Sequence, residues 1–101
     1  MLTRGMKATL NGRVVADAPE SELVSIEGNW YFPPSSIVDG ALENSATPYT
    51  CPWKGVAQYH DVAGQADLGW SYPTPPASAV ERVGSDFAGY VAFDRRVVEI
   101  S

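Results

Sequence analysis

The segment Cys51-Pro52-Trp53-Lys54-Gly55 carries a thiol and an amine three residues apart. Pro52 fixes its own φ and restrains Cys51, and Gly55 frees the backbone for a sharp bend. A lysine nearby lowers the pKa of a cysteine and makes it more nucleophilic. This loop could therefore contact a ligand or use Cys51 or Lys54 in covalent catalysis. The structural alternative is a buried Cys51 with Lys54 in solvent.

His60 is the only histidine and stands between Tyr59 and Asp61. Alternation along a strand places His60 on the face opposite both neighbours, which disfavours a His60–Asp61 dyad. His60 could still meet Cys51 across strands, so it is a further weak catalytic candidate beside a purely structural role. A structural zinc site needs four Cys or His ligands, and the chain has one of each. We therefore expect no metal and no cofactor, although a site of carboxylates alone stays open.

Aromatic side chains could form the wall of a binding cleft. Trp70 and Tyr72 stand two positions apart and so share one face of a strand. With Trp30 or Tyr59 they could stack a planar ring, whereas core packing is the alternative role. We expect the thiol, the amine and these aromatics to surround one concavity. The predicted ligand-binding residues are Cys51, Trp53, Lys54, Tyr59, Trp70 and Tyr72.

Short strands must position these side chains, because nine Gly and eight Pro separate runs rich in β-branched and aromatic residues. Asn11-Gly12 between residues 7–10 and 13–16 predicts a two-residue type I′ hairpin. The remaining expected strands are residues 23–27, 29–32, 56–62, 68–72, 87–93 and 97–100. We expect the last two to form a hairpin around Asp94-Arg95-Arg96, and a turn at Ala63-Gly64 to follow residues 56–62.

Two short helices and one loop complete the expected elements. Residues 35–42 and 77–83 could form one or two helical turns each, with Ser36 and Ser78 as caps and Gly84 as the stop of the second. Residues 47–54 contain two prolines and are expected to form an irregular loop.

Length and composition predict one domain, residues 1–101, with a core of roughly residues 7–100. The chain is 45% hydrophobic and 19% charged, which is typical of a folded domain. Its net charge is −5, and no basic run is present, so we expect no nucleic-acid or membrane partner.

A single cysteine allows no internal disulfide, and the start of the chain lacks an apolar stretch of signal-peptide length. Both observations favour the cytoplasm.

Four segments of the chain together resemble the DUF427 family. They are Asn11–Asp17, Thr50–Gly55 followed by Tyr59, Trp70–Tyr72 with the prolines after it, and Gly89–Phe93. The resemblance covers residues 7–100. It implies an architecture similar to β-tent proteins, in which two antiparallel sheets lean together over a cleft. Some catalogues call the family nucleotidyltransferase-like.

The residues themselves do not favour nucleotidyl transfer. Two-metal phosphoryl chemistry needs carboxylates held together, which usually appear as Asp-x-Asp after a Gly-Ser. Gly84-Ser85 is present, but no Asp-x-Asp follows it, and Asp94 stands alone.

We therefore predict a mainly β domain with two antiparallel sheets or a partly open barrel, β-tent-like, and one or two short helices. The predicted function is binding of a small planar or anionic ligand in a cleft near the Cys51–Gly55 loop. Two alternatives remain: an enzyme that uses Cys51 or Lys54, and a ligand-free interaction protein that forms a homodimer through a sheet edge.

Overall fold

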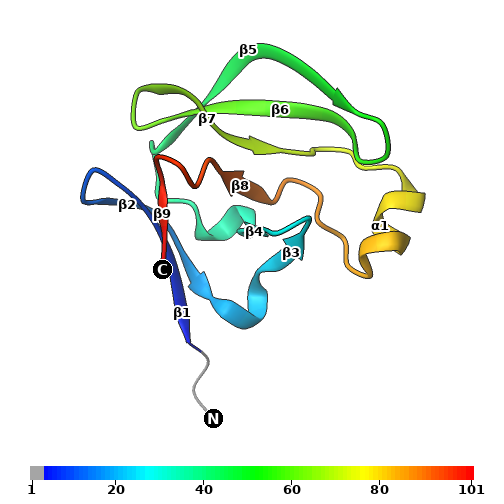
Figure 1. Ribbon diagram of the computed structural model, residues 1–101, viewed down its shortest axis with the longest axis horizontal. Coiled ribbons are helices and arrows are strands. Elements are labelled where there is room, and N and C mark those ends of the chain that lie inside the picture. Colours follow the sequence, from blue (N-terminus) through cyan, green and yellow to red (C-terminus); the bar gives the residue numbers. More distant parts are fainter. Residues whose placement is uncertain (1–3) are drawn as a thin grey trace.

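The computed structural model describes residues 4–101, and β-strands dominate this part of the chain (Figure 1). The first four strands are β1 (Gly5–Leu10), β2 (Arg13–Pro19), β3 (Val24–Ile26) and β4 (Asn29–Tyr31). The later strands are β5 (Leu42–Cys51), β6 (Gly55–Val62), β7 (Gln65–Ser71), β8 (Val91–Phe93) and β9 (Glu99–Ile100). The described helical segments are α1 (Ala77–Val83) and two short 3-10 turns, Glu20–Glu22 and Pro34–Ser36. The mainly β prediction is confirmed.

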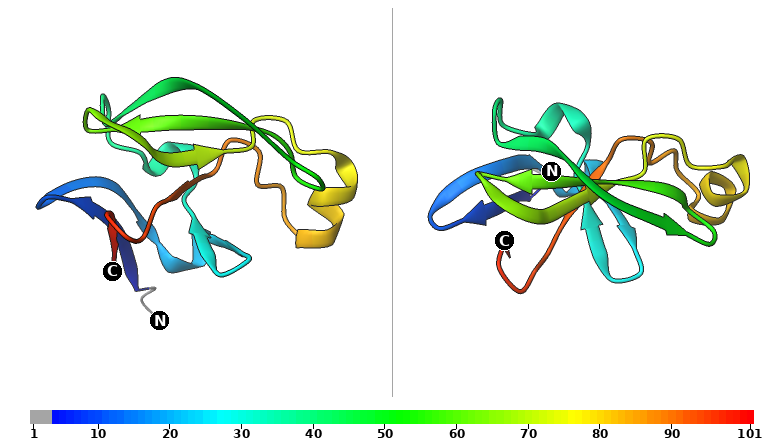
Figure 2. Two further views of the ribbon diagram at one scale, coloured as in Figure 1. Left: turned by 45° about the horizontal axis from the view of Figure 1, so that its top comes forward. Right: turned by 90° about the horizontal axis from the view of Figure 1, so that it is seen from above.

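The strands of residues 4–101 form three antiparallel sheets, in the orders β2-β1-β9, β3-β4 and β5-β6-β7-β8. The four-stranded sheet lies along one side of the molecule, and the two smaller sheets lie on the other side (Figure 2). A bridge between Phe32 and Val91 joins the two sides. The structure therefore has three sheets where the sequence predicted two sheets or a partly open barrel.

Tight turns at X-Gly pairs connect several of the paired strands. Asn11 and Gly12, between β1 and β2, have φ values of 51° and 81°, which confirms the predicted type I′ hairpin. The pair Ala63-Gly64 between β6 and β7 also has two positive φ values, at the predicted turn. Glu27-Gly28 turns β3 into β4 in the same way.

The helix predicted for residues 35–42 is wrong. Only the 3-10 turn Pro34–Ser36 forms, and Ile37 is already extended. The backbone N–H of Val38 donates to the Val15 carbonyl of β2 at 3.0 Å, so this backbone finds its partner in a sheet and not in a helix. Ser36 donates its hydroxyl to the Pro33 carbonyl instead of capping a helix.

The irregular loop predicted for residues 47–54 is also wrong. Strand β5 continues to Cys51, and only Pro52, Trp53 and Lys54 form the turn into β6. Pro48 stands in an edge strand, which is where a sheet tolerates proline, because one side of such a strand has no pairing partner. The register of β5 against β6 shifts between Asn44 and Pro48.

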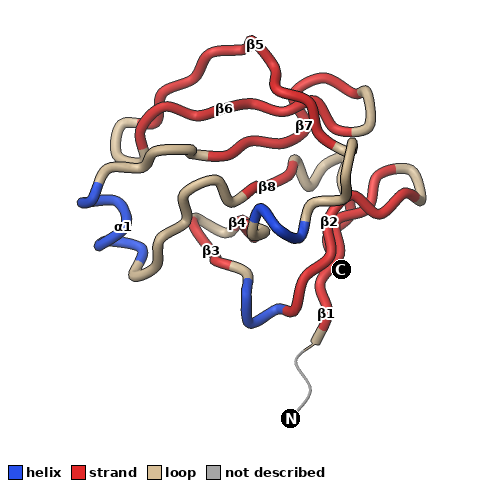
Figure 3. The backbone as a smooth tube through the Cα atoms, turned by 180° about the vertical axis from the view of Figure 1, so that it is seen from behind, coloured by secondary structure: helices blue, strands red, loops and turns tan. Residues whose placement is uncertain are grey.

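The predicted C-terminal hairpin does not form. Strand β8 pairs with β7, and β9 pairs with β1 at the other side of the molecule (Figure 3). Asp94 does begin a turn, since its carbonyl accepts the backbone N–H groups of Val97 and Val98. That turn sends the chain from one sheet to another.

Helix α1 matches the predicted residues 77–83 and ends at Gly84, whose φ is 86° and whose N–H donates to the Val80 carbonyl. The predicted Ser78 cap is wrong, because the helix begins at Ala77 and leaves Ser78 inside its first turn. No helix within residues 4–101 combines the length and apolar character needed to cross a membrane.

Two core clusters lie on opposite faces of the central strands. The first core cluster contains Met6, Ala8, Leu10, Val15, Ala16, Ala18, Leu23, Phe32, Ala41, Val62, Val91, Phe93 and Val98. The second core cluster contains Ile26, Tyr31, Cys51, Ala57, Tyr72, Ala79, Phe87 and Ala92. Strand β8 contributes side chains to both clusters, because successive residues of a strand point to opposite faces. Val91 and Phe93 belong to the first cluster, and Ala92 belongs to the second.

Candidate functional site

Three aromatic side chains form a diagonal row across β5, β6 and β7. Tyr59 lies directly opposite Trp70, and Tyr49 lies opposite Ala57, two residues before Tyr59. Alternation therefore places Tyr49, Tyr59 and Trp70 on one face of the sheet. The Tyr49–Tyr59 and Tyr59–Trp70 ring centroids are both 6.4 Å apart, with interplanar angles of 68° and 56°. We call these three residues the aromatic row.

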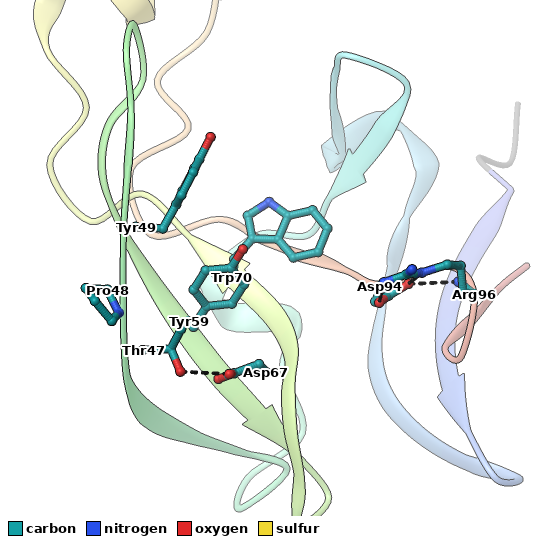
Figure 4. A pocket seen from close by; sticks show the side chains of 8 residues that line it. All are labelled: Thr47, Pro48, Tyr49, Tyr59, Asp67, Trp70, Asp94 and Arg96. Atoms are coloured by element: carbon teal, nitrogen blue, oxygen red, sulfur yellow. Dashed lines mark hydrogen bonds and ion pairs between the residues drawn. The ribbon is translucent and has the colours of Figure 1, made fainter.

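Two adjoining cavities share the aromatic row. The large cavity, about 450 Å³, is lined by the row together with Thr47, Pro48, Asp67, Asp94 and Arg96 (Figure 4). The small cavity, about 220 Å³, is lined by the row together with Asn29, Tyr31, Lys54 and Tyr72. The two cavities therefore have a common aromatic wall, and we call the pair of cavities the cleft.

A buried cation lines the small cavity. Lys54, in the turn between β5 and β6, is only 6% exposed. Its Nζ donates to Glu27 Oε1 and lies 5.0 Å from the centroid of the Tyr72 ring. Burial alone would lower the pKa of Lys54, but the hydrogen bond to Glu27 and the electrostatic effect of Tyr31 and Tyr72 raise it overall. The amine is therefore a charged donor at neutral pH and not a free nucleophile.

The carboxylate partner of Lys54 comes from a different sheet. Glu27 lies in the β3–β4 turn with a positive φ of 52°, and Gly28 after it also has a positive φ, as in a type I′ turn. The Glu27–Lys54 ion pair joins this turn to the turn between β5 and β6. The side chain of Glu27 is 56% exposed, so the pair is buried on the lysine side only.

Phenol groups complete the small cavity. Burial raises the pKa of the Tyr72 hydroxyl to about 12 and also raises the pKa of Tyr31. Both groups are therefore neutral hydroxyls at pH 7. Trp70 Nε1 donates to the Tyr31 hydroxyl at 3.1 Å, which holds the indole in place within the aromatic row.

The large cavity is bordered by acidic groups. Thr47 donates its hydroxyl to Asp67 Oδ2 at 2.7 Å, across β5 and β7 (Figure 4). Arg96 donates to both oxygens of Asp94, at 3.0 and 2.8 Å. The hydroxyl groups of Ser45 and Thr47 lower the pKa of Asp67, and the hydrogen bonds from Arg96 lower that of Asp94. Both carboxyl groups are therefore ionised at neutral pH.

The structure brings together four of the six residues predicted to bind a ligand. Lys54, Tyr59, Trp70 and Tyr72 line the small cavity. Cys51 is 7% exposed and lines neither cavity, because its side chain packs in the second core cluster.

Trp53 also lines neither cavity. Two cations lie near its ring, with Lys54 Nζ at 5.4 Å and Arg82 Cζ at 4.3 Å from the centroid. Trp30, suggested as a further wall residue, packs against the first core cluster instead.

His60 lies on the other face of β6. Its Nε2 is 2.9 Å from Ser71 Oγ, and its Nδ1 is buried with no hydrogen-bond partner among the described residues. Burial lowers the pKa of His60, and the nearby Asp61 only partly offsets this effect. The His60 imidazole is therefore buried, favours its neutral form and lies away from the cleft.

The sequence interpretation missed eight residues that line the cleft, and also Glu27, the partner of Lys54. The eight lining residues are Asn29, Tyr31, Thr47, Pro48, Tyr49, Asp67, Asp94 and Arg96. Tyr49 was missed because residues 47–54 were assigned to a loop, whereas β5 continues to Cys51 and places Tyr49 in a strand. Glu27 was assigned to the end of the predicted strand 23–27, although the X-Gly pair Glu27-Gly28 before the strand at 29–32 could have suggested a hairpin turn. Glu27 meets Lys54 across 27 positions, for which no local signal exists.

Among residues 4–101, no group of three or more His, Cys, Asp or Glu side chains is arranged to hold a metal ion. In comparisons with known proteins, residues 2–101 match the family described as a domain of unknown function (DUF427). No curated protein matches the chain.

Proposed function

The chain belongs to the DUF427 family, and from that premise we propose that it is a binding module for a small planar ligand. The ligand stacks on Tyr49, Tyr59 and Trp70, and its polar edge reaches the Lys54 end of the cleft. The observation that carries this proposal is the row of three aromatic rings shared by two adjoining cavities. Ligand sites typically combine such apolar walls with a few convergent polar groups.

The polar groups at the Lys54 end favour hydrogen bonding over charge neutralisation. Glu27 already balances the Lys54 ammonium, so an anion would have to compete with this carboxylate. The Asn29 side chain and the neutral Tyr72 hydroxyl can donate to or accept from an uncharged polar edge. A planar ligand therefore fits the cleft better than a compact anion.

The alternative of an enzyme that uses Cys51 or Lys54 has less support. Cys51 packs in the second core cluster, outside both cavities, and Lys54 is held protonated by its ion pair. A nucleophile needs an accessible thiolate or a free amine. The free thiol of Cys51 agrees with the cytoplasmic location that we propose for the protein.

The proposal is tested by titrating the protein with benzamide while recording backbone and indole N–H signals by NMR. The Trp70 indole signal is the direct reporter, because Trp70 Nε1 lies at the border of the small cavity. We expect saturable shifts at the aromatic row with a Kd on the order of 1–10 mM, as is normal for so small a probe. Cyclohexanecarboxamide, which lacks a planar ring, should bind more weakly.

A matched pair of variants locates the binding. Tyr59→Leu removes the central ring of the row and should weaken benzamide binding by roughly fivefold. Tyr90→Leu is the control, since Tyr90 is also half-buried but lines neither cavity. Equal affinity for the planar and non-planar amides, or equal loss in the two variants, would contradict the proposal.

A further inference from the structure

The two ends of the cleft differ in charge. At the small cavity, the Lys54 ammonium is paired with Glu27, and the net charge of the pair is zero. The large cavity is lined by the carboxylates Asp67 and Asp94 and by the guanidinium Arg96. Arg96 is paired with Asp94, which leaves the Asp67 carboxylate as the unbalanced charge.

Asp67 has no cationic partner among the described residues. Its Oδ2 accepts the Thr47 hydroxyl, and its Oδ1 is buried with no hydrogen-bond partner in residues 4–101. The residue lies in the part of β7 where the pairing with β6 shifts register, and its φ is 58°. Few non-glycine residues occupy this left-handed region, although Asp tolerates it. An ionised, unbalanced carboxylate therefore stands at the border of the large cavity.

The neighbouring rings also favour positive charge. A cation over the face of Trp or Tyr is attracted by the ring quadrupole, and a delocalised planar cation can in addition stack on the ring and is more weakly hydrated than a compact one. The rings of the aromatic row meet at 68° and 56°, so their faces are not parallel and border the cavity from different directions. Aromatic faces beside one carboxylate form a recognition pattern for cations.

We propose that the ligand of the cleft is a planar cation, such as an aryl amidinium, whose ring lies on the aromatic row and whose positive group lies beside Asp67, away from the Lys54 ammonium. Only an uncharged polar edge of such a ligand faces the Lys54 end. This inference rests on the proposed function, since it names the charge class of the ligand that the row stacks. It assigns to Asp67 the selection of cationic over neutral and anionic planar ligands.

Three probes of equal size and shape test the assignment: benzamidine, benzamide and benzoate, which are cationic, neutral and anionic at pH 7. Their Kd values are measured by NMR titration of the intact protein at about 20 mM salt, where exposed charges are weakly screened. We expect benzamidine to bind roughly five- to tenfold more tightly than benzamide, and benzoate to bind more weakly than both.

Asp67→Asn is the diagnostic variant. Asn keeps an oxygen that can accept from Thr47 and adopts the left-handed backbone readily, so the fold should be preserved. The preference for benzamidine over benzamide should fall to about one, while the benzamide Kd stays unchanged. Asp39→Asn removes the same charge at an exposed position outside both cavities and should leave the preference intact.

The outcomes separate this inference from the proposed function. Equal binding of benzamidine and benzamide to the row, tightest binding of benzoate, or an unchanged preference in Asp67→Asn overturns the inference and leaves the planar-ligand proposal standing. If none of the three probes shifts the signals of the aromatic row, the proposed function fails and the inference fails with it.

Discussion

Lys54 and His60 are both buried polar residues, but their environments act on their charges in opposite directions. Lys54 meets a carboxylate and two phenol groups, so its charge is retained despite burial. His60 meets only the Ser71 hydroxyl and a nearby Asp61, so burial favours its neutral form. The partner available to a buried group, and not burial by itself, decides its protonation state.

The pKa of His60 predicts a pH dependence of stability. The folded-state pKa lies below the ordinary value of about 6.5, so as the pH falls the unfolded chain binds a proton first. The contribution of His60 is fully present above about pH 6.5 and is lost as the pH falls toward the folded-state pKa. The slope of the unfolding free energy should be at most about 1.4 kcal/mol per pH unit.

Urea unfolding between pH 7.5 and pH 5 measures this slope. The unfolding free energy of the His60→Gln variant should change less steeply with pH than that of the wild type, even if the two proteins differ in stability at every pH. Asp67 and Asp94 have lowered pKa values, so their contributions change at more acidic pH and do not obscure the comparison. Parallel pH profiles for the two proteins would refute the assignment to His60.

At the scale of elements, the turn between β1 and β2 depends on one glycine. Gly12 has a φ of 81°, and an added Cβ there would meet nothing within 4 Å, so any cost of substitution comes from the backbone. Gly12→Val should lower the free energy of unfolding by about 1–2 kcal/mol, because a β-branched residue is strained at positive φ.

Gly5→Val is the matched control for this prediction. Gly5 lies in the same hairpin, also has open space around its Cβ position, and does not have a positive φ. Its substitution should be neutral or slightly stabilising, because valine suits a strand. Equal destabilisation of the two variants in urea unfolding would show that the turn conformation is not the cause.

At the scale of the whole molecule, β8 connects the two core clusters. Phe93 packs edge-on against Phe32 in the first cluster, at 5.7 Å between ring centroids, while the adjacent Ala92 belongs to the second. Because the clusters share this strand, we expect them to unfold together, in agreement with the predicted single domain.

Phe93→Ala tests this coupling. Removing a fully buried ring should cost about 3–5 kcal/mol of unfolding free energy. The transition seen by tryptophan fluorescence, which includes Trp53 and Trp70 beside the second cluster, should move with the transition seen by far-UV circular dichroism. A fluorescence transition that stays at the wild-type urea concentration would mean that the clusters are independent.

Local patterns in the sequence were enough for part of this description. The type I′ turn at Asn11-Gly12, the strand before Ala63-Gly64 and the helix ended by Gly84 follow from backbone preferences of a few adjacent residues. Alternation likewise placed Trp70 and Tyr72 on one face, and both line the small cavity.

The rest was decided by contacts between distant segments, which no local preference records. Strand β8 pairs with β7 and not with the nearby β9, because Val91 and Phe93 fill the first core cluster. Lys54 is buried because Glu27, which follows β3, supplies its counter-charge. The spacing of residues along the chain determined several of the turns and strands and the shared face of Trp70 and Tyr72. Tertiary packing decided which faces meet, and therefore where the cleft and its charges lie.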